Sequence, residues 1–311
     1  MSQVHFLRQP PPAELGRALV EFEEQFTYPL GANDSFSISH GPEYVTFFQA
    51  IGEAVVLVVE EEGRVLGTLA AVLRPLRIPQ GQVHRVAYLA DLKMVREVRF
   101  RLPRYLRAMS EHLQVPSNCG YAVVMDGTRS TPDRYTGRGS IPSFRTQAKV
   151  TVLSLRTRLG NERDCEVDEE RLNRRWAESR PAGAVVPLSG QSRLRSERAP
   201  LALEWGSACG LLEDTRRGKR LLHTDGTEMR AAHLSRFLFE NERDGAALLE
   251  QAARRCAREG IPVLFACLPE SAAQRLLPHL RQLQVLPAPA TVYAVGFPPD
   301  WSEWWLDSAE I

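Results

Sequence analysis

The positions of apolar and polar residues divide the first half of the chain into short helices and strands. Residues 13–26 place apolar side chains at helical spacing. The run AVVLVV at 54–59 predicts a buried strand, and residues 60–64 a turn that returns the chain along 65–73 as a hairpin. The same reasoning predicts the other elements of this half, which are a helix at 43–51, a strand within 84–95, a helix at 101–113, a strand at 121–125, a short helix opening at 132–135 and a strand at 149–155.

The second half repeats this order of elements. Residues 201–212 and 219–222 predict a hairpin pair. The pattern that follows predicts a strand at 231–239, an amphipathic helix at 245–258, a strand at 261–268, a helix at 270–280 and a strand at 291–297. Corresponding positions are 141 to 145 residues apart, and Leu89 and Leu234 are separated by 145. One element order repeated at one offset favours a duplication.

Length and composition agree with two domains. The chain has 311 residues, about twice a typical domain, and its 43% of hydrophobic residues can supply a core to each half. Between residues 156 and 200, Arg, Glu, Ser, Pro and Gly dominate, which predicts a connection and the opening of the second half. We expect an N-terminal domain at 1–157 and a C-terminal domain at 158–311, with 158–200 partly linker.

Charge and cysteine usage exclude several classes of protein. The net charge of +1 argues against strong binding to nucleic acid. The sequence contains no run of about 18 apolar residues, so no membrane helix is predicted. Residues 1–12 lack the apolar segment of a secretory signal. The five widely spaced cysteines form no CxxC pair, so neither a zinc site nor a disulfide framework is predicted. We therefore expect a cytoplasmic protein without a metal.

The repeated order of elements resembles that of the GNAT acyltransferase superfamily. In both halves hairpin strands precede a strand that leads into a helix, and a strand, a helix and a last strand follow. The resemblance implies an α/β fold with a mixed sheet, built as two tandem GNAT-like domains. It further implies acetyl-CoA or another acyl-CoA as substrate, and a small-molecule or peptide amine as the acyl acceptor.

The segment after the central strand of the first half follows the family's coenzyme A motif in part. Leu92 and Met94 stand at its two apolar positions, and Arg99 at the position of its Arg or Gln. In the family, backbone N–H groups and a helix start hold the pyrophosphate. The resemblance implies that the acyl-CoA-binding residues of this chain are Leu92, Met94, Arg99, Arg101 and Arg104.

The first half also departs from this motif. The family's glycine positions hold Leu102 and Arg104, and Pro103 between them removes a backbone donor. Arg99, Arg101 and Arg104 could supply cationic contacts to phosphate instead. The alternative is a solvated face at a helix start, where positive charge is mildly unfavourable.

The corresponding helix start of the second half predicts a structural role. Asp244 stands in place of the family's Arg and is predicted to be an N-cap. Gly245 and the two alanines after it are small enough for close approach, but Glu240 and Glu242 would repel a pyrophosphate.

Asp91 and Tyr135 are the candidates for acid–base chemistry. Asp91 lies within the strand YLADLKM, where the resemblance implies a general base for the amine proton, and Tyr135 matches by order the Tyr that protonates the thiolate. The alternatives are an ion-paired structural Asp and a packing Tyr. Ser235 and Gln274 hold the corresponding places in the second half, so no equivalent pair is predicted there. Residues 135–142, with the run GRGS, predict a substrate loop or a plain turn.

The sequence contains no motif of a serine hydrolase, a nucleotide-binding protein or a zinc enzyme. It contains no GxSxG elbow, no phosphate loop and no HExxH or similar histidine spacing. Trp301, Trp304 and Trp305 would be grouped by a helical turn and pack onto the body of the protein, with a homodimer contact as the alternative. Two hypotheses result. The first is an acyl-CoA-dependent N-acyltransferase with one functional half, and the second is a non-catalytic tandem GNAT-like protein that binds a ligand or partner.

Overall fold

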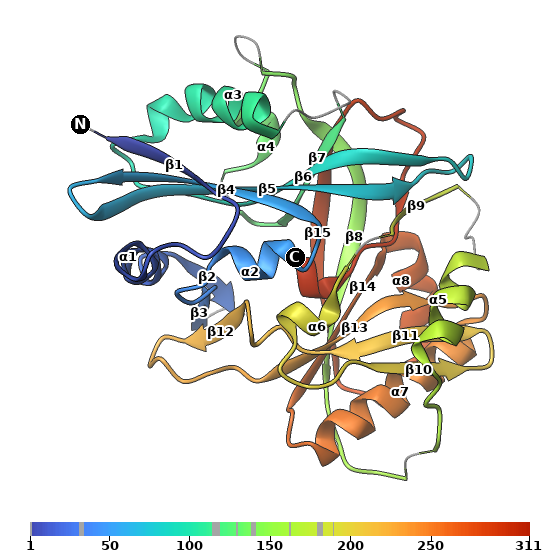
Figure 1. Ribbon diagram of the computed structural model, residues 1–311. Helices are drawn as coiled ribbons and strands as arrows, with labels where there is room; N and C mark the ends of the chain where they lie inside the picture. Colours follow the sequence, from blue (N-terminus) through green and yellow to red (C-terminus); the bar gives the residue numbers. More distant parts are fainter. Residues whose placement is uncertain are drawn as a thin grey trace.

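The apolar strands of both halves join one mixed sheet that runs through the molecule (Figure 1). The computed structural model describes residues 2–30, 34–113, 119–128, 130–137, 141–161, 163–178, 183–188 and 190–311. In sheet order the strands are β1 (Gln3–Leu7), β4 (Glu53–Glu61), β5 (Arg64–Arg77), β6 (Val83–Met94), β7 (Gly120–Met125), β15 (Val285–Val295), β8 (Arg145–Arg156), β14 (Val263–Pro269), β13 (Ala231–Leu238), β11 (Ala208–Glu213) and β10 (Leu201–Trp205).

Short strands and helices complete the fold. The strands β9 (Ala184–Pro187) and β16 (Glu303–Trp304) attach to the side of the large sheet, and β12 (Arg220–His223), β3 (Asp34–Ser39) and β2 (Thr27–Leu30) form a separate small sheet. The helices are α1 (Ala13–Glu23), α2 (Val45–Gln49), α3 (Leu102–Leu113), α4 (Pro132–Tyr135), α5 (Glu169–Glu178), α6 (Ser192–Arg195), α7 (Glu242–Arg258) and α8 (Glu270–Leu276), with 3₁₀ turns η1 (Arg99–Arg101), η2 (Leu277–His279) and η3 (Ser308–Glu310).

Strand β4 shows why the first half needs helices on both faces of the sheet. Its side chains alternate between faces, as the period of a strand requires. Val55 and Leu57 pack with the buried side chains of α3 on one face, and Val56 and Val58 pack with those of α1 and α2 on the other (Figure 1). Each face therefore has its own apolar core, and the predicted buried strand at 54–59 is confirmed.

The two halves exchange their last strands. Strand β8 of the first half pairs with β14 of the second, and β15 of the second half pairs with β7 of the first. The exchanged strands β8 and β15 also pair with each other. Separating the halves would break a continuous ladder, so they form one sheet. The domain boundary at residue 157 stays a prediction.

A β-bulge recurs at the same place in both halves. Asp91 in β6 and Arg236 in β13 have positive φ angles of 51° and 50°. In both cases the register with the neighbouring hairpin strand shifts beside that residue. The two positions are 145 residues apart, which is the offset that the sequence repeat predicts. Because a left-handed conformation costs a non-glycine residue about 1–2 kcal/mol, its occurrence in both halves supports a duplicated fold.

Three expectations about local structure are wrong. Residues 201–212 close their own hairpin at Gly206, whose φ is 55°, so β12 is free to pair with β3 instead. Asn241, and not Asp244, caps α7, because the helix begins at Glu242 and the Asn241 side chain accepts a hydrogen bond from the Arg243 N–H. The tryptophans do not share a helical turn, since Trp304 lies in strand β16.

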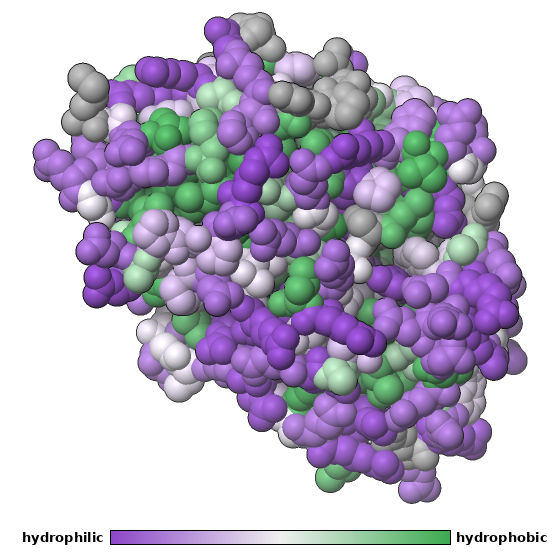
Figure 2. Space-filling view, in the orientation of Figure 1, coloured by the Kyte–Doolittle hydropathy of each residue, from purple (hydrophilic) through white to green (hydrophobic). Residues whose placement is uncertain are grey.

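The tryptophans do pack onto the body of the protein, as expected: all three are buried, and Trp304 is 0% exposed. Figure 2 shows polar side chains over most of one face, interrupted by small apolar areas. Among the described helices none is long and apolar enough to cross a membrane.

Candidate functional site

The facing edges of β6 and β7 separate shortly after they meet. Within the described residues these parallel strands pair only where Ala87 and Tyr88 face Gly120 and Tyr121. Beyond this point the side chains of residues 89–92 on β6 and 123–125 on β7 are half-buried. The bulge at Asp91 follows, and bulges end pairing and redirect side chains. The first half therefore presents two unpaired strand edges beside Asp91.

A hydrogen-bonded cluster surrounds the Asp91 carboxylate. Lys93 Nζ lies 2.7 Å from Asp91 Oδ1, and the Tyr44 hydroxyl donates a hydrogen bond to Oδ2. The Thr68 hydroxyl donates to the Asp91 backbone carbonyl at 3.2 Å, which holds the bulge in place. Both carboxylate oxygens of the predicted base are thus already hydrogen-bonded.

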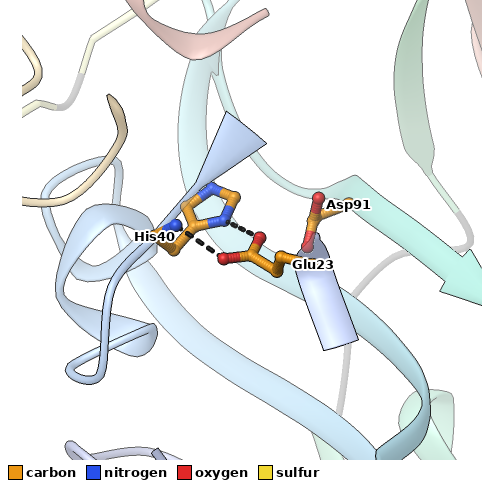
Figure 3. Close-up of side chains that lie close together, drawn as sticks. All are labelled: Glu23, His40 and Asp91. Atoms are coloured by element: carbon orange, nitrogen blue, oxygen red, sulfur yellow. Dashed lines mark hydrogen bonds and ion pairs between the residues drawn. The ribbon is translucent and has the colours of Figure 1, made fainter. Parts of the chain in front are cut away.

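Glu23 and His40 extend this cluster toward α1 and β3 (Figure 3). Glu23 Oε1 lies 2.7 Å from both Lys93 Nζ and His40 Nδ1, and Oε2 accepts the His40 backbone N–H at 2.7 Å. Figure 3 shows the Glu23 carboxylate between His40 and Asp91. Since Glu23 is 1% exposed and Lys93 3%, water can contribute little to balancing their charges.

The cluster has the donor set of a metal site but holds its own cation. Glu23, His40 and Asp91 can each place one ligand atom within 4.8 Å of the others. The Lys93 ammonium lies 2.7 Å from both carboxylates and supplies the positive charge that a metal ion would bring. A metal would have to displace Lys93, so the geometry favours an ion-paired proton network.

The electrostatic environment gives the groups of the cluster different charge states at neutral pH. Burial raises the pKa of Asp91, but the charges of Lys93 and His40 and the hydrogen bonds from Lys93 and Tyr44 outweigh it and hold that pKa below its ordinary value. Burial lowers the pKa of Lys93, but Asp91 and Glu23 outweigh this and raise it. Burial and Asp91 raise the pKa of Tyr44 well above its ordinary value. At neutral pH the cluster thus contains an ionised Asp91, a charged Lys93 and a neutral Tyr44.

Tyr135 lies apart from this cluster. It is half-buried at the end of α4 and packs against the apolar cluster on the α3 face of the sheet. Burial raises its pKa, with contributions from Asp133 and Tyr293. The structure gives no hydrogen bond between Tyr135 and Asp91 in the described part of the chain. Residues 135–137 and 141–142 of the predicted substrate loop are described, and residues 138–140 lie outside the described residues.

The predicted acyl-CoA residues divide into apolar and cationic groups. Leu92 is half-buried beside the unpaired edge, and Met94 is 5% exposed and belongs to the core. Arg99 and Arg104 are exposed at the start of α3, and Arg99 donates to the Met94 carbonyl at 3.3 Å. Arg101 donates to the Ser2 hydroxyl at 2.7 Å.

The backbone before α3 has few donors left for a phosphate. The N–H groups of Val98, Arg99 and Arg101 donate to carbonyls of residues 95, 96 and 98. The 3₁₀ turn η1, which leads into α3, has no side-chain cap. An anion at this helix start would depend on the arginine side chains, as the departures from the motif predict.

In the second half the corresponding strands are covered by the chain itself. Residues 304–310 are all buried, and η3 packs against both β13 and β14. The Asp307 carboxylate accepts the N–H of the bulge residue Arg236 at 2.6 Å, and Ser308 Oγ lies 3.1 Å from His233 Nδ1. In Figure 1 the C-terminus is drawn near α2 and β15.

Buried ion pairs anchor this segment, residues 303–311, to both halves. Glu310 forms a bidentate pair with Arg74 of β5, in which Nη2 lies 3.2 Å from Oε1. Arg195 Nη1 lies 3.4 Å from Glu310 and Nη2 lies 2.7 Å from Glu213. Arg74 is 0% exposed and Arg195 1%, so these charges depend on each other.

Solved structures with the same fold extend over nearly the whole chain. Saccharomyces cerevisiae N-myristoyltransferase with bound myristoyl-CoA matches 99% of this chain and 87% of its own, with a TM-score of 0.61 and 9% identity. This chain has a GNAT-like fold. A candidate acetyltransferase of Pyrococcus horikoshii matches 96% of this chain and 90% of its own (TM-score 0.56, 11% identity). A candidate N-acyltransferase of Enterococcus faecalis V583 matches 94% and 72% (TM-score 0.51, 10% identity).

Sequence comparisons add no finer assignment. No protein-family model and no curated protein matches the chain. At 9 to 11% identity the GNAT-like fold is shared, and the roles of individual residues do not transfer with it. The predicted roles of the site residues therefore stay predictions.

Several residues of the site carried no sequence signal. Glu23 ends α1, His40 and Tyr44 lie in the segment between β3 and α2, and none of the three belongs to a motif. Lys219 comes from the second half and lies at the edge of the same cluster. The one available signal was scarcity, because the chain has only three lysines, and two of them, Lys93 and Lys219, are buried here.

Proposed function

We propose that this protein is an acyl-CoA-dependent N-acyltransferase whose first half binds the acyl-CoA and carries out the chemistry. The acceptor is a small-molecule or peptide amine. The observation that carries the proposal is the pairing of two unpaired strand edges, at residues 89–92 and 123–125, with a buried acid–base cluster around Asp91. In the second half residues 304–310 cover the equivalent strands.

The arrangement supports acyl transfer in physical terms. A thioester between the strand edges could form the backbone hydrogen bonds that β6 and β7 no longer form with each other. Arg99 and Arg104 are exposed at the helix start that follows and could contact the phosphates. The adjacent cluster contains both charged and neutral proton-carrying groups. Asp91 as base and Tyr135 as acid remain the predicted pair to be tested.

One observation favours the alternative of a non-catalytic ligand-binding protein. The Asp91 carboxylate already accepts hydrogen bonds from Lys93 and Tyr44, as a structural carboxylate would. Tyr135 packs on the α3 face of the sheet's first half, and within the described residues no hydrogen bond joins it to Asp91. If neither residue takes part in chemistry, the same edges could still bind an acyl-CoA.

The test combines binding and turnover on the full chain. Acyl-CoAs of increasing chain length are screened by thermal shift, since a ligand at 100 times its Kd adds about 2.7 kcal/mol to stability. Each acyl-CoA that binds is then incubated with a panel of amines and short peptides, with free thiol and acylated amine measured together. We expect stoichiometric release of CoA and amide. Binding without amide from any acceptor would reject the enzyme, and so would the absence of acyl-CoA binding; either result would support the alternative of a non-catalytic protein that binds a ligand or partner.

Variants distinguish the predicted pair from structural residues. Asp91→Asn should lower kcat by about 10²-fold or more with little change in KM if Asp91 is the base. Tyr135→Phe should do the same if Tyr135 protonates the thiolate. A variant that keeps full kcat removes that residue from the chemistry and leaves the rest of the proposal intact.

A further inference from the structure

The turn that leads into α3 carries an exposed aromatic side chain. Phe100 lies in η1 and is 73% exposed. Among the exposed large apolar side chains of the described residues it is the only aromatic one, the others being Val83, Leu159, Leu194 and Leu286. Single exposed apolar side chains are ordinary on protein surfaces, so the meaning of Phe100 depends on what surrounds it.

Positive charge is concentrated around this side chain. Residues 96–113 contain five arginines and two glutamates, which gives this segment a net charge of +3. The rest of the chain has 34 lysines and arginines and 36 acidic residues, a net charge of −2. The near-neutral charge of the whole protein therefore results from a basic surface at η1 and α3 and an acidic remainder.

Phe100, Arg104 and Arg107 form an outward stripe on this surface. They are spaced by four and three residues, so they lie on one face of the helical segment. All three are exposed, and the buried residues of α3 lie on the opposite face, against the sheet. In Figure 1 α3 lies on the opposite side of the molecule from α7. The stripe is therefore presented to the surroundings by the first half alone.

The neighbouring arginines contact the protein itself. Arg99 donates to the Met94 carbonyl at 3.3 Å, and Arg101 donates to the Ser2 hydroxyl at 2.7 Å. The Arg101 guanidinium also lies 5.1 Å from the centre of the Phe100 ring. At this distance a cation interacts favourably with an aromatic ring. Arg101 thus holds the ring in place without covering it.

We propose that the outward stripe docks on a membrane surface that contains anionic phospholipid. The arginine side chains lie among the phosphates of the headgroups, and the Phe100 ring enters the boundary between headgroups and acyl chains. The proposal does not depend on the acyl transfer proposed above. Because α3 begins where the acyl-CoA phosphates are proposed to bind, docking would bring that entrance to the lipid surface.

The chemistry of the stripe favours lipid over the other polyanion of the cell, nucleic acid. An exposed Phe is stabilised by an apolar environment and the arginines by anions, and an anionic lipid interface supplies both side by side. Nucleic acid also offers phosphates, but proteins that bind single strands stack successive bases on several aromatic side chains. Only one such ring is exposed here among the described residues.

The test is co-sedimentation of the full chain with lipid vesicles. Vesicles of phosphatidylcholine alone are compared with vesicles that contain about one third phosphatidylglycerol. We expect the protein to sediment with the anionic vesicles at about 50 mM salt and to be released at about 0.5 M salt, where surface charges are screened. It should stay in solution with phosphatidylcholine alone. No acyl-CoA is present, so the result is independent of acyl transfer.

Variants with matched controls locate the contact. Phe100→Ser should weaken binding to the anionic vesicles by about tenfold, because the ring is lost from the lipid. Arg107→Gln should weaken it by about fivefold, the effect of one arginine near an anionic surface. Leu159→Ser and Arg281→Gln replace an exposed leucine beyond β8 and an exposed arginine beyond η2. Both controls should bind like the parent protein.

Phe100→Trp adds a direct readout of insertion. Tryptophan favours the same interface, so this variant should bind at least as tightly as the parent. Its additional fluorescence should shift to shorter wavelength with anionic vesicles and stay unchanged with neutral ones. All variants should keep the parent's thermal unfolding midpoint, because every substituted side chain is exposed.

Two results would overturn the docking proposal. One is that the parent protein fails to sediment with the anionic vesicles at low salt. The other is that a folded Phe100→Ser binds them as tightly as the parent does. Either result leaves the proposed acyl transfer untouched, and rejection of acyl transfer by its own assay leaves the vesicle result standing.

Discussion

The two halves have the same bulged strand and use it in opposite ways. In the first half the bulge at Asp91 lies beside unpaired, half-buried strand edges and a cluster of proton-carrying groups. In the second half the bulge at Arg236 donates its N–H to Asp307, and residues 304–310 cover the strands. If the proposed site in the first half binds acyl-CoA, the duplicated fold keeps one ligand site and uses the other copy as a structural support.

The helix starts of the two halves differ in the same sense. The Asn241 side chain caps α7, and acidic residues Glu242 and Asp244 occupy its first turn. The turn η1 that leads into α3 has no side-chain cap and contains Arg99 and Arg101. Negative charge at a helix start is intrinsically favourable and positive charge is not. The helix start of the second half is therefore stabilised by its own residues. The arginines near the start of α3 have an unfavourable electrostatic energy, which an anionic ligand would lower.

The largest expected effect is on the free energy of unfolding, when the ion pairs of Glu310 with both halves are lost. Glu310→Ala should destabilise the protein by roughly 3–5 kcal/mol, because Arg74 and Arg195 would stay buried without their shared carboxylate. Urea unfolding measures this directly. Glu303→Ala is the control within the same segment, since Glu303 is only half-buried and its recorded partner is Ser271. A loss below about 1 kcal/mol for Glu310→Ala would show that the segment does not hold the second half closed.

The pH dependence of stability should differ in sign between the two bulges. Burial and the charge of Glu310 raise the pKa of Asp307 from 3.8 to about 6. Its stabilising contribution is complete below pH 4 and is lost as pH rises through 6, by about 3 kcal/mol in all. The pKa of Asp91 is lowered, so its contribution is present above pH 4 and is lost as pH falls further.

Unfolding midpoints measured from pH 3 to 8 distinguish the contribution of Asp307 to stability from that of Asp91. Asp307→Asn should flatten the curve between pH 4 and 6, and Asp91→Asn should flatten it below pH 4. If Asp307→Asn left the curve unchanged between pH 4 and 6, the segment would not carry a buried acid in the second half.

The exposed helix start gives a smaller effect, on binding alone. Arg99→Ala should weaken acyl-CoA binding by about 1.5–3 kcal/mol, because a charge-assisted contact to phosphate is lost. Stability should stay within about 0.5 kcal/mol, since Arg99 is exposed. Arg281→Ala, an exposed arginine of the second half, is the matched control and should leave the affinity unchanged. Equal affinities for both variants would remove Arg99 from the site.

Periodicity was enough to predict most strands and helices and the repeat itself. The offset between Leu89 and Leu234 matches that between the two bulge residues, which the structure added independently. The exchange of β8 and β15 could not be predicted, because an apolar run buried on both faces does not say which strand it will pair with. The predicted pairing of β12 with residues 201–212 was wrong for a related reason. Those residues form their own hairpin through a turn at Gly206, and β12 pairs with β3 instead.

The candidate site was only partly accessible to sequence reasoning. Asp91 could be chosen from its place in an apolar strand, because a buried acid needs an explanation. Its partners Glu23, His40 and Tyr44 lie 47 to 68 residues away in the sequence, and only the tertiary fold brings them together. Lys219 is still more remote, since it comes from the other half and was assigned to a hairpin strand.

The smallest expected effect tests whether the second half is structural at its helix start. Asn241→Ala should cost about 1 kcal/mol of stability, because the Arg243 N–H loses its acceptor at 2.8 Å. Acyl-CoA affinity should not change, because this helix start carries acidic residues and lies in the half whose strand edges are covered. Thermal unfolding with and without acyl-CoA measures both quantities in one experiment. The ligand-induced shift should be the same in the variant and the parent, even though the variant unfolds at a lower temperature. A smaller shift in the variant would mean that the second half contacts the ligand, and the division of roles between the halves would then have to be abandoned.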